Sequence, residues 1–123
     1  MADLEQYEGN AKKLRSNIET IQSTFDKYGL EVTGTGASFA DCLGGHAAKF
    51  YIEIAGNPKV VADNLYMKVN VYDEDNQLLG SGSCNKSIDL GSFSGFDTYE
   101  VTVISSTIWQ EAHKAKVYLA NSR

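Results

Sequence analysis

Apolar residues recur with a helical period in the first segment of the chain. Eight apolar or aromatic positions are spaced alternately three and four residues apart: Leu4, Tyr7, Ala11, Leu14, Ile18, Ile21, Phe25 and Tyr28. Charged and polar residues fill most positions between them, which is typical of an amphipathic helix with one apolar stripe. Gly29 is suited to end such a helix because glycine readily adopts a left-handed conformation. The pattern therefore predicts one continuous heptad helix across residues 1–29.

After Gly29 the period of the apolar positions changes to two. Four runs alternate apolar and polar residues and predict strands with one buried face: 48–54, 64–72, 98–104 and 114–120. Weaker strands are predicted at 31–35 and 78–88, and the glycine-containing stretch 34–46 is predicted to be the longest loop. Alternate apolar side chains of the strong strands should share one core: Phe50, Ile52, Val69, Val71, Val101, Val103 and Val117.

The spacing of these runs also limits the fold class. No helical period recurs between the strands, so a parallel sheet of strand–helix–strand units is disfavoured. Several short strands separated by close turns are typical of an antiparallel sandwich or a small barrel. The chain is therefore predicted to be mainly β, with a helical segment at 1–29 packing on or beside an antiparallel, immunoglobulin-like β-sandwich at 30–123.

One segment of the predicted sandwich resembles a known family. Residues 65–73 read Leu-Tyr-Met-Lys-Val-Asn-Val-Tyr-Asp and run into an acidic turn followed by an outgoing apolar segment. This resembles the FxLYD family of bacterial immunoglobulin-like sandwich domains, in which a strand ending in hydrophobic–x–hydrophobic–Tyr–Asp enters an acidic or glycine hairpin. Tyr72 and Asp73 match that motif, while Val69 and Val71 stand where the family has Phe and Leu.

The resemblance covers about residues 48–120, since the segments at Ile88 and 99–103 look like the family's next strand pair. Such domains are mostly extracytoplasmic accessory or interaction modules. They have no family-wide catalytic residues, so the resemblance implies a binding role and assigns no catalytic position.

Length and charge narrow the classes of partner. The 123 residues suffice for one soluble globular domain, and 16 Asp and Glu against 11 Lys and Arg give a net charge of −5. A negative body repels phosphates, so we expect no nucleic-acid partner. No apolar run reaches the length of a membrane-spanning helix, so we expect no membrane insertion, and residues 1–30 lack the pattern of a signal peptide. The family resemblance points outside the cytoplasm and the absent signal points inside, which leaves the compartment open.

Two cysteines and two histidines are the candidates for site chemistry: Cys42, Cys84, His46 and His113. Four such ligands can hold zinc, but their spacing lacks paired Cys-x-x-Cys or His-x-x-x-His motifs, so we expect no metal and no cofactor. A disulfide between Cys42 and Cys84 is the stronger hypothesis and requires an oxidising compartment. A nucleophilic Cys42 activated by His46 is the enzyme hypothesis. It is weak because a histidine so near in sequence does not easily reach the thiol on an extended chain.

Four tyrosines have the outward parity of their predicted strands and are the candidate binding residues: Tyr51, Tyr66, Tyr72 and Tyr118. Outward aromatic rings can form a recognition surface, pair across strands, or seat the N-terminal helix. The apolar stripe of that helix must be buried either on the chain's own sheet or against the same helix of another subunit. Bulky aromatic residues in the stripe favour the first arrangement over a homo-oligomer formed through the helix.

These observations favour a non-enzymatic binding or assembly module whose partner is a protein. Two alternatives stay open. One is a small-ligand-binding protein with a pocket between helix and sheet, and the other is a cysteine-dependent enzyme centred on Cys42.

Overall fold

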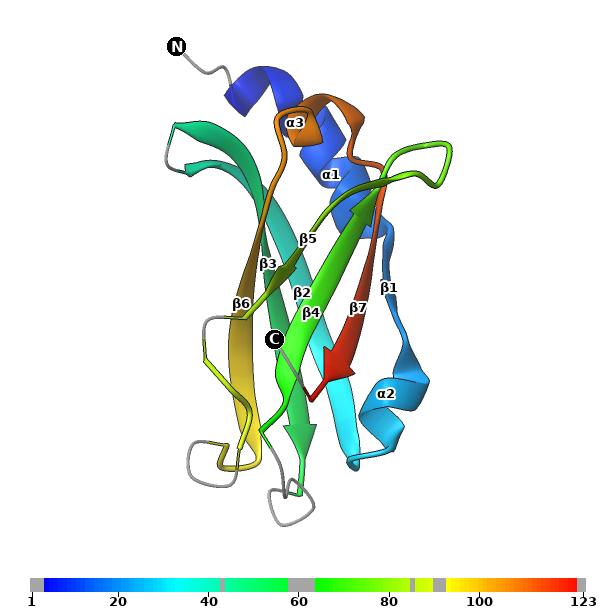
Figure 1. The fold of residues 1–123 in the computed structure, drawn as a ribbon, viewed down its shortest axis with the longest axis vertical. Coiled ribbons are helices and arrows are strands. Elements are labelled where there is room, and N and C mark those ends of the chain that lie inside the picture. The colour runs from blue at the N-terminus through cyan, green and yellow to red at the C-terminus, as the bar shows by residue number, and fades with distance from the viewer. Residues whose placement is uncertain (1–3, 43, 58–63, 85, 90–92, 122–123) are drawn as a thin grey trace.

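The computed structural model describes residues 4–42, 44–57, 64–84, 86–89 and 93–121, and it shows a mainly β sandwich of two sheets (Figure 1). Its strands are β1 (Ile18–Thr20), β2 (Leu30–Cys42), β3 (Gly45–Gly56), β4 (Tyr66–Tyr72), β5 (Leu78–Ser83), β6 (Phe96–Ile104) and β7 (Lys114–Ala120). Its helical segments are η1 (Leu4–Tyr7), α1 (Glu8–Ser16), α2 (Gln22–Asp26) and α3 (Ile108–Glu111). No helix within these ranges is long and apolar enough to cross a membrane.

Three of the four strands with the clearest alternation, β3, β4 and β7, are central in their sheets, and the fourth, β6, is an edge strand. One sheet has the order β1-β7-β4-β5 and the other has the order β2-β3-β6. Neighbouring strands are antiparallel except β1 and β7, which are parallel. The predicted two-sheet, mainly β fold is confirmed. In immunoglobulin constant domains the last two strands are neighbours, whereas here β6 and β7 lie in different sheets.

The core consists of the inward residues of both sheets. All seven residues predicted to share it are fully buried. The prediction succeeds because successive side chains of a strand point to opposite faces, so one buried face selects alternate residues. Phe93 and Trp109, which lie outside the four strong runs, are also buried.

The single helix predicted across 1–29 is wrong. Helix α1 ends at Ser16, and the chain then crosses to β7. The side-chain amide of Asn17 donates a hydrogen bond to the carbonyl of His113 at 3.1 Å, and the backbone carbonyl of Asn17 accepts one from the N–H of Ala115. Strand β1 follows and pairs with β7. Isolated helical turns are marginal in water. A ladder of backbone hydrogen bonds at the sheet edge, together with β-branched residues in this segment, therefore favours a strand.

Part of the predicted apolar stripe is nevertheless buried within the chain, although Ile21 is 39% exposed. Ala11 and Leu14 of α1 enter the core at the end of the sandwich where α1 contacts β2 and α3 (Figure 1), and Phe25 of α2 is fully buried. These stripe residues belong to the core cluster between the sheets, to which Tyr51, Tyr72 and Tyr118 do not belong. The continuous helical stripe through which a homo-oligomer was expected is not present, because Leu14 and Phe25 are occupied in the core and Ile18 belongs to a strand.

The long loop predicted at 34–46 is wrong as well. These residues form most of β2, a tight hairpin and the start of β3, with Cys42 paired to Gly45 and Gly44 at a φ of 79°. Ala37 and Phe39 of β2 are buried. Gly34 and Gly36, which precede these two residues, concealed the alternation in the sequence.

Candidate functional site

The four candidate tyrosines do not form one surface. Tyr51 projects from the outer face of the β2-β3-β6 sheet, while Tyr66, Tyr72 and Tyr118 lie on the outer face of the β1-β7-β4-β5 sheet. Their outward parity is confirmed, but the two faces are on opposite sides of the sandwich. Sequence parity could not assign them to sheets because sheet membership depends on long-range pairing.

Three large exposed apolar side chains lie along one outer sheet face, with Tyr51 between the other two. We name this surface the Tyr51 face, and it comprises the outward residues of β3 and β6: Lys49, Tyr51, Glu53, Phe96, Thr98, Glu100, Thr102 and Ile104. Tyr51 is 40% exposed, Phe96 58% and Ile104 53%. These are three of the five large apolar side chains that are exposed in the described ranges. Phe96 and Ile104 each lie four residues along β6 from Glu100, the partner of Tyr51, so the three side chains are spread along the face at intervals of about 13 Å.

A shallow trough of about 250 Å³ runs beside Tyr51. Its lining residues come from three adjacent strands: Gly34, Thr35, Gly36, Tyr51, Glu53 and Thr98. Gly36 pairs with Tyr51, has no positive φ, and would place an added Cβ in open space. Nothing among the described residues therefore requires glycine at this position. A strand glycine of this kind is found where a ligand or another backbone approaches closely.

The charges of the Tyr51 face are mostly negative. The Glu100 carboxylate lies 3.7 Å from the Lys49 ammonium, and the Glu53 carboxylate accepts a hydrogen bond from the Thr33 hydroxyl at 2.8 Å. Two carboxylates thus flank Tyr51, with one lysine beside them. The sequence showed these residues as an ordinary polar strand face and gave no signal that Phe96 and Ile104 would extend it.

The opposite side of the sandwich carries tyrosines and lysines. We name it the tyrosine–lysine face, and it comprises outward residues of β4 and β7: Tyr66, Lys68, Asn70, Tyr72, Lys114, Lys116 and Tyr118. Asn70 donates to the Tyr72 hydroxyl at 3.2 Å and lies 3.5 Å from the Tyr118 hydroxyl. The ammonium groups of Lys114 and Lys116 lie 5.7 and 5.3 Å from the centre of the Tyr72 ring, which is cation–π distance. Side chains of this face therefore hold one another in place.

The lysines of this face are only partly neutralised. Lys114 lies 3.7 Å from Glu19 of β1 and donates to the Asn76 side chain. Lys68 and Lys116 make no ion pair with any residue in the described ranges. The face is thus locally positive on a chain whose net charge is −5.

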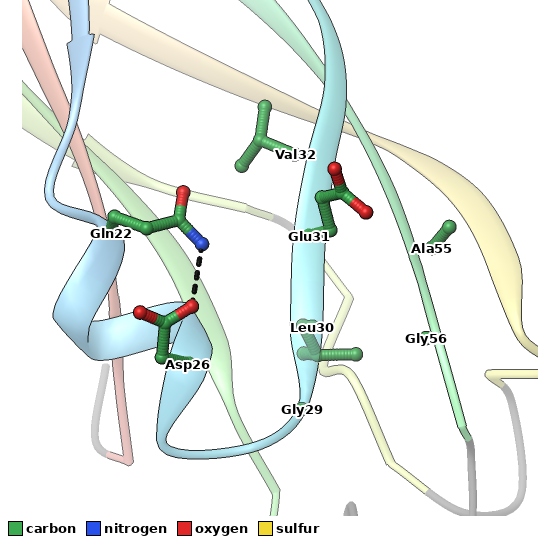
Figure 2. Close-up of a pocket in the computed structure, with 8 residues that line it drawn as sticks. All are labelled: Gln22, Asp26, Gly29, Leu30, Glu31, Val32, Ala55 and Gly56. Atoms are coloured by element: carbon green, nitrogen blue, oxygen red, sulfur yellow. Dashed lines mark hydrogen bonds between the residues drawn. The ribbon is translucent and has the colours of Figure 1, made fainter.

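An open groove of about 650 Å³ separates α2 from β2 (Figure 2). Gln22 and Asp26 line its helical side, where the Gln22 amide donates to the Asp26 carboxylate at 2.8 Å, and Glu31 and Val32 line the strand side. The position between helix and sheet is the one that the small-ligand hypothesis requires. However, small-molecule sites enclose most of the ligand within mainly apolar walls, and this groove is open and carries two carboxylates.

The hairpin register separates Cys42 from His46. Asp41 pairs with His46 and Cys42 pairs with Gly45. Directly paired residues share a face, so the side chains of Cys42 and His46 point to opposite faces of the hairpin. The His46 ring stacks on Trp109 with 3.7 Å between ring centres. This geometry does not provide the thiol–imidazole pair that the enzyme hypothesis needs.

Both cysteines are free thiols, so the structure contains no Cys42–Cys84 disulfide. Cys84 is buried. Its thiol sulfur accepts a hydrogen bond from the Met67 N–H at 3.1 Å, and the thiol donates one to the Lys86 carbonyl at 2.9 Å. Its role in the structure is to satisfy the backbone at the point where the chain leaves β5. The described residues contain no cluster of three or more His, Cys, Asp or Glu suited to a metal.

One ion pair was not anticipated from the sequence. The Lys86 ammonium donates to the Asp97 carboxylate at 3.1 Å and lies 4.8 Å from the centre of the Tyr99 ring. Burial alone raises the pKa of Asp97, but the hydrogen bonds from Lys86 and from the Thr98 N–H outweigh it and hold that pKa below its ordinary value of 3.8. Burial is the main cause that raises the pKa of Tyr99, and the negative charge of Asp97 raises it further.

Lys86→Ala should raise the pKa of Asp97 toward its ordinary value. The folded pKa of Asp97 is lower than the unfolded one, so its ionised form stabilises the fold above that ordinary value, and this contribution is lost as the pH falls through the folded pKa. Nuclear magnetic resonance titration of the Asp97 carboxyl carbon measures the shift. Lys68→Ala is the control and should leave the titration unchanged; an unchanged pKa in Lys86→Ala would contradict the assignment.

No family model, curated protein or solved structure matches this chain. The two outer faces of the sandwich are therefore the features from which a function can be argued.

Proposed function

We propose that this chain is a non-enzymatic protein-binding module and that the Tyr51 face is its binding surface. The observation that carries the proposal is the exposed Tyr51 ring beside a trough in which nothing among the described residues requires the glycine at position 36, with Phe96 and Ile104 exposed farther along the same sheet face. Glu53 and Glu100 on the same face favour a partner that combines apolar contact groups with basic side chains. Aromatic residues near the centre of such a patch are the usual anchors of binding energy.

The backbone beneath this face is rigid, which supports a binding role. Strand β3 is central in its sheet, and its inward residues Phe50, Ile52 and Ile54 are fully buried. A surface supported in this way can bind without refolding and loses little entropy on association. The resemblance of residues 48–120 to FxLYD domains, which are mostly interaction modules, favours the same function.

Selection of peptides from a random phage-displayed library on the immobilised chain tests the proposal. We expect enriched peptides with apolar and basic residues, and we expect Tyr51→Ser combined with Phe96→Ser to weaken their binding at least about tenfold, because removal of one binding anchor costs about 2 kcal/mol.

The matched control replaces the two large exposed apolar residues that lie elsewhere, Ile21→Ser with Leu78→Ser. This variant should retain peptide binding. Equal losses in both variants, or selected peptides that bind the Tyr51→Ser and Phe96→Ser variant normally, would contradict the proposal.

A further inference from the structure

We propose that the partner of the Tyr51 face is the tyrosine–lysine face of a second copy of this chain. The inference rests on the proposed function and names its partner. It follows from charge, spacing and side-chain type on the two outer faces, which the sandwich places on opposite sides of one molecule.

The two faces are complementary in charge. Glu53 and Glu100 on the Tyr51 face stand beside the single cation Lys49. On the other face Lys68, Lys114 and Lys116 stand beside a single acid, Glu19, which pairs in register with Lys116. Since the chain as a whole is acidic, a locally positive face is the part of it that can approach the glutamates of another copy without repulsion.

The spacing of the charges also matches. On the tyrosine–lysine face Lys68 pairs across the strands with Tyr118, so Lys116 is its diagonal neighbour. On the Tyr51 face Glu53 pairs with Thr98, so Glu100 is its diagonal neighbour. Diagonal neighbours on adjacent antiparallel strands are about 7–8 Å apart. Two lysines and two glutamates with the same separation can therefore form two ion pairs across one interface.

The aromatic groups fit the same arrangement. Sheets that stack face to face are about 10 Å apart and interdigitate their side chains. Tyr51 stands beside a trough of about 250 Å³ with no side chain on its glycine floor, which gives room for an aromatic ring from the opposing face. Tyr72 and Tyr118 lie beside Lys116 and Lys68 and are placed to supply it.

The arrangement has a consequence for assembly. Each interface uses two different faces, so every bound pair still has one free face of each kind, one at either end. Heterologous contacts of this type produce open stacks rather than closed dimers. The assembly should therefore grow with concentration and weaken with salt, because its ion pairs lie at an accessible interface.

Sedimentation velocity and light scattering on the unmodified chain give the first test. We expect the average mass in low salt to rise from that of one chain to at least twice that value as the concentration approaches millimolar. We expect the mass to return to that of one chain in half-molar sodium chloride. A chain that stays monomeric throughout this range overturns self-assembly, while peptide selection still decides the proposed function independently.

Charge-reversal variants give the second test. Lys68→Glu with Lys116→Glu, and Glu53→Lys with Glu100→Lys, should each be monomeric with an intact thermal transition. An equimolar mixture of the two variants should assemble again. The native Tyr51 face of the first variant can bind the native tyrosine–lysine face of the second, and the two reversed faces are also opposite in charge. The control Lys12→Glu with Lys13→Glu makes the same charge change on the exposed side of α1 and should assemble like the unmodified chain. Assembly that persists in either reversed variant alone, or a mixture that stays monomeric, overturns the pairing.

Discussion

Gly82→Ala should destabilise the sandwich by about 3 kcal/mol, at the upper end of the cost of overpacking a core. Gly82 lies on the inward side of β5 opposite Val69, where β5 passes directly over β6. A Cβ at this position would overlap the carbonyl oxygen of Thr102. That oxygen belongs to the backbone and cannot rotate away, so β5 and β6 must separate, and the core between them opens.

Urea unfolding followed by circular dichroism measures this loss. The matched control is Gly36→Ala, since Gly36 also lies in a strand but has open space around the added methyl group and no positive φ. The control should be neutral or more stable by up to about 1 kcal/mol, because alanine reduces the entropy of the unfolded chain. A Gly82→Ala variant as stable as the control would refute the close approach of β5 to β6.

Trp109→Ala should cost about 3–5 kcal/mol of unfolding free energy, the range for deleting a buried tryptophan. Trp109 of α3 is 1% exposed and its indole N–H donates to the Ala47 carbonyl at 3.0 Å. Its ring contacts Tyr7, Phe39 and His46, which come from the N-terminal segment and from both strands of the hairpin. Its removal therefore leaves a cavity at the point where three distant parts of the chain meet.

The variant removes the chain's single tryptophan, so circular dichroism rather than fluorescence must follow the unfolding. Trp109→Phe is the comparison variant. It keeps an aromatic ring but loses the hydrogen bond to Ala47, and it should lie between the unmodified chain and Trp109→Ala. A loss below about 1 kcal/mol in Trp109→Ala would contradict its central position, because surface substitutions cost that little.

The strands show how far a sequence pattern reaches. Alternation in β3, β4, β6 and β7 is physical, because a pleated strand with one buried face must bury every second side chain. The sequence pattern predicts a loop over much of β2, because Gly34 and Gly36 have no side chains and so interrupt the alternation of apolar and polar residues. Small residues can still form a strand through backbone hydrogen bonds to the neighbouring strand, and the pattern of side chains does not show these bonds.

The binding residues show a different limit. The alternation along each strand correctly predicted that all four candidate tyrosines face outward. It could not show that Tyr51 lies on a different sheet from the other three, because strands of either sheet have the same alternation. Phe96 was not recognised as part of a surface. Only the register of β6 on β3 brings it to the same face as Tyr51.

By itself the sequence determined the mainly β class, the four clearly alternating strands and the seven core residues that they share, since all three follow from local periodicity. The tertiary structure alone decided where the N-terminal segment ends as a helix. An apolar stripe from Leu14 to Phe25 fits a helix by its spacing, but the free edge of β7 offers residues 18–20 a ladder of backbone hydrogen bonds. The strand forms because those bonds and the packing beside them exceed what a few more helical turns contribute. Such an edge exists only once distant strands have paired.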